Sequence, residues 1–64
     1  MTVKERVLQY LKDVGTSKSN AEIARAIGAP EPSVRRATSA LEGRGIYYSD
    51  MSYRGVGLWR AAVA

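Results

Sequence analysis

The chain has 64 residues, of which 45% are hydrophobic and 25% are charged, the balance of an ordinary globular domain. It contains no cysteine and no histidine, which excludes disulfides, the usual zinc ligands and Ser–His or Cys–His catalysis. Ten basic against six acidic residues give a net charge of +4, and this excess indicates a polyanionic partner.

Membrane proteins and enzymes are both disfavoured by the sequence. No apolar run approaches the roughly 18 residues of a membrane span, and no signal-peptide core is present, so we expect a cytoplasmic protein. Acidic residues are scattered, no phosphate-binding glycine loop occurs, and so short a chain leaves little room for a substrate pocket. We therefore expect a single domain over residues 1–64 with no enzymatic activity, no cofactor and no metal.

The first predicted element is a helix from Val3 to about Val14. Thr2 and Glu5 have the spacing of a capping box, in which each side chain accepts a hydrogen bond from the other residue's backbone N–H. Apolar residues then recur at helical intervals, and Gly15 suits the left-handed position that ends a helix.

A second, short helix is predicted to begin in the polar stretch Thr16–Asn20. Ser19 and Glu22 repeat the capping-box spacing, and Gly28 ends the helix. A helix of barely two turns needs tertiary packing to persist. A residue or two near Thr16–Ser17 could add a short edge strand.

A third helix follows the connection from Gly28 to Glu31. Pro32 fits its first helical position, Glu31 is a poor cap by propensity, and Gly43 or Gly45 ends it. Helical periodicity predicts an inward row of Val34, Ala37, Thr38 and Leu41. The outward row is then Ser33, Arg35, Arg36, Ser39 and Glu42.

The remainder of the chain changes to the pattern of strands. Ile46–Tyr48 is β-branched and aromatic, and Leu58–Ala62 can form a second strand. Ser49–Gly57 has the composition of a hairpin loop. Trp59 and one of the two adjacent tyrosines should turn toward the helices. The predicted fold class is therefore α+β, with three helices followed by a two-stranded hairpin.

This order of elements resembles the winged helix-turn-helix family of DNA-binding proteins. MarR-like bacterial regulators have a recognition helix and helix exit similar to residues 33–46, SVRRATSALEGRGI. Residues 21–28, AEIARAIG, resemble the first helix of the helix-turn-helix and its turn. Residues 58–60, LWR, have a weaker likeness to the wing of Z-DNA-binding winged helices, whose recognition-helix asparagine and tyrosine are replaced here by Arg35 and Ser39.

The resemblance implies which residues contact DNA. In a helix-turn-helix the second helix enters the major groove, and its N-terminal residues meet the base edges. The implied recognition-helix contacts are Ser33, Arg35, Arg36 and Ser39. An arginine can hold guanine through two hydrogen bonds. The alternative is that both arginines are merely solvated, or pair with Glu31 and Glu42.

Two further contact regions are expected. The start of the second helix offers N–H groups and a positive charge to a DNA phosphate through Ser17, Lys18 and Ser19, while Ser19 also caps the helix. The wing loop carries Tyr53 and Arg54, and an arginine there can enter the minor groove or bind its phosphates.

The sequence thus predicts a sequence-specific double-stranded DNA-binding protein, a small prokaryotic or phage transcriptional regulator that acts by occupancy. Exposed aromatics, Tyr10 with Tyr47 or Tyr48, are a candidate homodimer contact. The alternative function is a winged-helix protein-interaction module within a larger assembly, and a third is binding to structured RNA or Z-form DNA. The prediction fails if the outward arginines are covered or neutralised by acidic neighbours.

Overall fold

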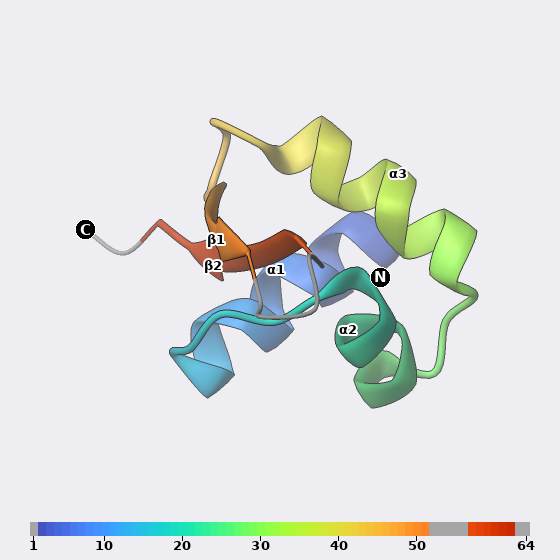
Figure 1. The fold of residues 1–64 in the computed structure, drawn as a ribbon. Coiled ribbons are helices and arrows are strands. Elements are labelled where there is room, and N and C mark those ends of the chain that lie inside the picture. The colour runs from blue at the N-terminus through green and yellow to red at the C-terminus, as the bar shows by residue number, and fades with distance from the viewer. Residues whose placement is uncertain (1, 52–56, 63–64) are drawn as a thin grey trace.

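A computed structural model describes residues 2–51 and 57–62, in which three helices precede a two-stranded antiparallel sheet (Figure 1). The helices are α1 (Val3–Val14), α2 (Asn20–Ile27) and α3 (Glu31–Leu41). The strands are β1 (Ile46–Met51) and β2 (Gly57–Ala61). This is the α+β winged helix-turn-helix architecture that the sequence predicts.

Helices α1 and α2 both begin at a capping box. The Thr2 hydroxyl accepts from the Glu5 N–H at 3.2 Å, and the Glu5 carboxylate accepts from the Thr2 N–H at 3.2 Å. Ser19 and Glu22 form the same reciprocal pair at 3.2 and 3.1 Å. The glycine after each helix has a left-handed φ, of 65° and 69°. The predicted boundaries of both helices are therefore confirmed.

Helix α3 starts one residue earlier than the sequence predicts. Glu31 rather than Pro32 is the first helical residue, and Pro30 takes the N-cap position in an extended conformation with no side-chain cap. The Pro30 carbonyl accepts from the N–H groups of Ser33 and Val34, both at 3.1 Å. Both prolines are tolerated because the first turn of a helix contains N–H groups that have no partner within the helix.

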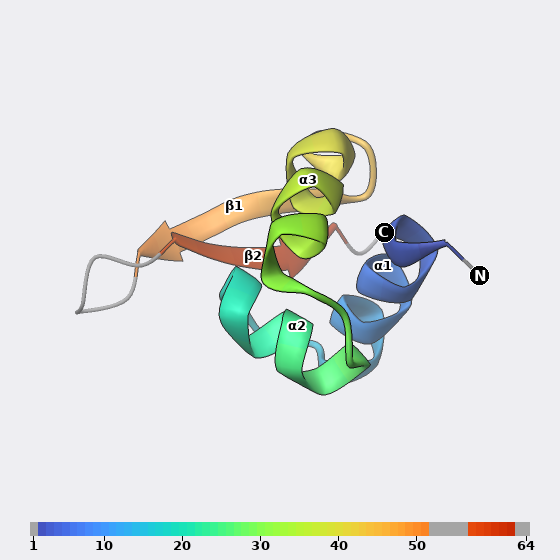
Figure 2. The same ribbon diagram turned by 90° about the vertical axis from the view of Figure 1, so that its right-hand side faces the viewer.

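The strands pair with Ile46 opposite Ala61 and Tyr48 opposite Trp59. The first strand continues to Met51 instead of ending at Tyr48, because pairing with β2 resumes after a register shift. Since directly opposite residues share a sheet face, Tyr48 lies on the same face as Trp59 and the buried Ile46. Tyr48 is nevertheless 43% exposed. The far ends of the two strands extend beyond the helices (Figure 2).

The third strand expected near Thr16–Ser17 is reduced to a single bridge at the next residue. The Lys18 N–H donates to the Trp59 carbonyl at 2.9 Å, and the Trp59 N–H donates to the Lys18 carbonyl at 2.8 Å. The segment between α1 and α2 is thereby joined to β2.

The hydrophobic core lies between the three helices and the base of the hairpin. Its fully buried apolar side chains are Val7, Leu11, Ile23, Val34 and Ile46, all 0% exposed. Burying a side chain of this size contributes about 1.5–3 kcal/mol relative to leaving it in water. Because these side chains come from α1, α2, α3 and β1, one core fixes the helix-turn-helix against the hairpin.

Candidate nucleic-acid interface

Helix α3 has one buried and one exposed face, as its sequence predicts. The residues that face the core are Val34, Ala37 and Thr38, each at most 3% exposed. Of the predicted contact residues, the structure exposes Arg35, Arg36 and Ser39 and leaves Ser33 half-buried. Packing of the apolar row therefore places two guanidinium groups on the surface of this helix.

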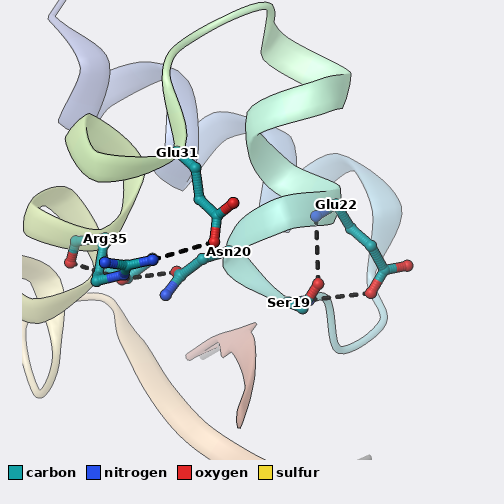
Figure 3. A network of polar contacts seen from close by, with 6 residues as sticks. Ser19, Asn20, Glu22, Glu31 and Arg35 are labelled. Atoms are coloured by element: carbon teal, nitrogen blue, oxygen red, sulfur yellow. Dashed lines mark hydrogen bonds and ion pairs between the residues drawn. The ribbon is translucent and has the colours of Figure 1, made fainter. Parts of the chain in front are cut away.

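Arg35 is paired with an acidic residue of its own helix. Its Nη2 lies 3.2 Å from Oε1 of Glu31, with the two side chains 63% and 47% exposed (Figure 3). An ion pair this exposed contributes only about 0.2–1 kcal/mol, so it leaves the arginine accessible to a ligand. Arg36 makes no ion pair or hydrogen bond with any residue of 2–51 or 57–62. Both arginines are exposed, and only Arg35 has an acidic partner among the described residues.

A buried polar contact joins α3 to the start of α2. The Thr38 hydroxyl, 0% exposed, lies 2.9 Å from Oδ1 of Asn20 and 3.0 Å from the carbonyl oxygen of Arg35. Helical periodicity predicts Thr38 in the inward row but does not indicate its partner Asn20. A hydroxyl in an otherwise apolar row is the signal that could have prompted a search for one.

The start of α2 is organised by Ser19 and Glu22. Ser19 is only 6% exposed, and its hydroxyl accepts from the Glu22 N–H, so the predicted capping role is confirmed. The hydrogen bond from the Ser19 N–H lowers the pKa of Glu22 below its ordinary value of 4.5, against an opposing effect of burial. Lys18 Nζ lies 4.0 Å from Oε2 of Glu22. Contact of Ser17, Lys18 or Ser19 with a phosphate stays a prediction.

Two aromatic rings pack together on one face of the hairpin. The rings of Tyr48 and Trp59 meet edge to face, with centroids 5.7 Å apart. A Cβ at Gly57 would stand 2.8 Å from Cε2 of Tyr48, so a larger residue at position 57 would displace the ring of Tyr48. Through the Lys18 bridge, the same aromatic pair is connected to the approach to α2. The predicted wing contacts Tyr53 and Arg54 lie outside the described residues.

Residues 6–50 match the sequence model of the family described as the IclR helix-turn-helix domain. The match extends over well over half of the 64-residue chain. The chain belongs to this family. It carries a DNA-binding domain of the transcription-regulator type. Comparison with curated proteins and with solved structures gives no significant match.

The region matched to the IclR family runs from within α1 into β1. It includes every predicted contact residue of α2 and α3, and it ends before Tyr53 and Arg54. The wider assignment to helix-turn-helix DNA-binding proteins therefore holds. The finer likeness of residues 33–46 to MarR regulators is not the one that the family match identifies.

A shallow hollow of about 270 Å³ lies between α1 and α2 of this IclR-family domain. Its lining residues are Arg6, Gln9, Tyr10, Asp13, Ala26 and Ile27. Arg6 donates to the Ile27 carbonyl at the end of α2, a favourable position for a cation. Gln9 donates to Asp13 at 2.9 Å. Much of the polar lining is therefore engaged within the protein.

Two general features of the described ranges can be stated. No helix in residues 2–51 and 57–62 is both long and apolar enough to cross a membrane. In the same ranges, no three His, Cys, Asp or Glu side chains gather in a group able to hold a metal ion.

Proposed function

We propose that this IclR-family domain binds double-stranded DNA sequence-specifically and regulates transcription by occupying its site. Helix α3 enters the major groove, and the β1–β2 hairpin approaches the minor groove or the DNA backbone. The observation that carries the proposal is the two-sided α3, whose buried face is locked into the core while Arg35 and Arg36 stand exposed on the other. Ser33 and Ser39 add hydroxyl groups to the same surface.

The phosphate contacts come from the start of α2 and from the wing. Lys18 holds a positive charge beside the N-terminus of α2, with its side chain 29% exposed, and Ser17 precedes it. Ser19 acts through the helix start that it caps. We assign Tyr53 and Arg54 to the wing contact because they lie between β1 and β2 in the sequence.

We further propose that two copies bind together on a repeated or palindromic site, because one module of this size forms a small DNA interface. Tyr47 and Tyr48 are each 43% exposed, and Tyr10 is half-buried, so these aromatics are the candidate homodimer contacts. Sedimentation of the free chain and of its DNA complex would measure the number of copies.

The first test is the salt dependence of binding to a duplex selected from random DNA. If about four phosphates are contacted, log K should fall with log[salt] with a slope near −3.6, which is about 100-fold between 50 and 200 mM. Competition with Z-form DNA and with RNA duplexes measures whether B-form DNA is preferred. An affinity that is indifferent to salt contradicts the proposal.

A paired substitution tests the surface itself. We expect Arg35→Ala with Arg36→Ala to weaken specific binding by at least about 100-fold while the chain stays folded, because one direct base contact and one phosphate contact are lost. The circular dichroism spectrum and melting temperature check the fold. If DNA affinity is unchanged but a protein contact is lost, the chain is instead a protein-interaction module.

A further inference from the structure

We infer that Glu31 and Arg35 act together to read one G·C base pair, and that Arg36 instead contacts a phosphate. This inference rests on the proposed function, since it assumes that α3 lies in the major groove. It makes Glu31 a specificity-determining residue. From the sequence, that residue is expected to be a poor cap and an alternative partner for an arginine.

The position of Glu31 suits base contact. It is the first residue of α3, and the N-terminal residues of a recognition helix are those that reach base edges. Its carboxylate is 47% exposed and does not fold back to cap the helix. Arg35 lies one helical turn further on, so the two side chains share the exposed face.

The geometry of the pair leaves both side chains able to bind a base. The contact is between Nη2 of Arg35 and one oxygen of Glu31, at 3.2 Å. A guanidinium carries N–H groups along two edges. A single contact from Nη2 uses one of its hydrogens and leaves the other edge complete. Glu31 likewise retains a second carboxylate oxygen as an acceptor.

The remaining groups match a G·C pair in the major groove. Guanine presents the acceptors N7 and O6, and cytosine presents the N4 amino donor beside them. A free guanidinium edge supplies two donors and the adjacent carboxylate supplies one acceptor, in the complementary order. An A·T pair presents a different pattern, with the donor N6 and the acceptors N7 and O4. The carboxylate would then face O4, which is itself an acceptor.

The two arginines differ in how firmly they are held. The guanidinium of Arg35 lies 3.2 Å from Oε1 of Glu31, which favours one placement of the Arg35 side chain. A side chain restrained before binding loses less conformational freedom on forming a directed contact. Arg36 has no such partner among the described residues. A cation without a partner among the described residues suits a phosphate, which requires charge more than direction.

The test is selection from random duplex DNA with the unchanged chain and with Glu31→Gln, followed by affinity measurements on the selected site and on its single-base-pair variants. Glu31→Gln should lower the preference for G·C at one position by about 5-fold or more, since a good base contact discriminates by about 5- to 150-fold. Glu42→Gln is the matched control. It removes the same charge from the end of α3 and should raise affinity for all duplexes alike.

Three further variants complete the design. Arg35→Ala should relax the same base-pair position, and adding Glu31→Gln to it should change the preference no further, because the two residues act as a unit. Arg36→Ala should weaken all sequences alike and make the salt slope shallower by about 0.9. A thermal melt of each variant checks that it is folded.

The outcomes separate the two proposals. If Glu31→Gln behaves like Glu42→Gln, raising affinity uniformly with the base preference intact, the inference is overturned while the proposed function stands. If the unchanged chain binds no duplex in a salt-dependent manner, the proposed function itself fails. If preference at one G·C position falls with Glu31→Gln and with Arg35→Ala but not with Arg36→Ala, the inference is supported.

Discussion

The starts of α2 and α3 differ, although each has a glutamate in its first turn. At α2, Glu22 is the third helical residue, and its carboxylate accepts from the Ser19 N–H behind it at 3.1 Å. At α3, Glu31 is the first helical residue, and its carboxylate lies against Arg35 one turn ahead at 3.2 Å. The position of a glutamate within the first turn therefore decides whether it serves the backbone or an exposed side chain.

The two helices also differ in what stabilises them. The α2 start depends on a side-chain cap, whereas α3 begins at Pro30 without one and is held by its buried face. The surface pair on α3 is consequently free to take part in binding, because the helix does not need it. Three predictions test this difference, in order of decreasing effect on stability.

The largest effect is expected from Thr38→Val, which breaks the buried contact between α3 and the start of α2. The substitution leaves the Asn20 side-chain oxygen without its donor, and we expect a loss of about 1–3 kcal/mol. Urea unfolding measures it. Ser39→Ala, at an exposed neighbour, should stay within about 0.5 kcal/mol of the unchanged chain. Equal stability of the two variants would contradict the importance of this contact.

The second prediction compares the two glutamates directly. Glu22→Ala removes the acceptor for the Ser19 N–H and should cost about 0.5–1 kcal/mol more than Glu31→Ala, which removes only an exposed ion pair. The order should reverse in DNA binding, where Glu31→Ala changes base preference and Glu22→Ala does not. If the Glu31 variant is the less stable of the two, Glu22 does not stabilise its helix start more than Glu31 does.

The smallest effect concerns pH. The pKa of Glu22 is lowered by hydrogen bonds from Ser19, of which the bond from the backbone N–H has the largest effect. Hydrogen bonds from Thr2 lower the pKa of Glu5 in the same way. A carboxylate with a lowered pKa contributes its stabilisation fully above its unfolded value near 4.5 and loses it as the pH falls through the folded value. Melting temperatures from about pH 5 to pH 3 should therefore fall, and less steeply for Glu22→Gln. Identical profiles for the two chains would exclude a contribution from Glu22.

The parts of the fold that sequence predicts correctly are those with local causes. A capping box and a following glycine act within one turn, so the bounds of α1 and α2 could be derived from residues near each end. The start of α3 is off by one because Pro30 and Pro32 both suit a helix start, and only the backbone geometry distinguishes them. The helical periodicity of apolar residues likewise predicts the buried and exposed faces of α3.

The parts that could not be derived depend on residues distant in sequence. The contact between Asn20 and Thr38 spans two helices, and no periodicity encodes it. The bridge between Lys18 and Trp59 depends on where the hairpin returns, so the sequence could indicate a short edge strand only near Thr16–Ser17 and not at Lys18 itself. The pair of Glu31 and Arg35 was among the alternatives considered, but its single-oxygen geometry required coordinates.

The bridge between Lys18 and Trp59 has a mechanical consequence. Its two backbone hydrogen bonds, at 2.9 and 2.8 Å, tie the approach to α2 directly to β2, so the hairpin cannot pivot about its own base without breaking them. A duplex bound by both α3 and the hairpin would then contact two elements whose separation is fixed. DNA sequences whose groove spacing matches this separation would bind with the lowest bending energy. The sequence preference of the protein would then extend to base pairs that no side chain touches.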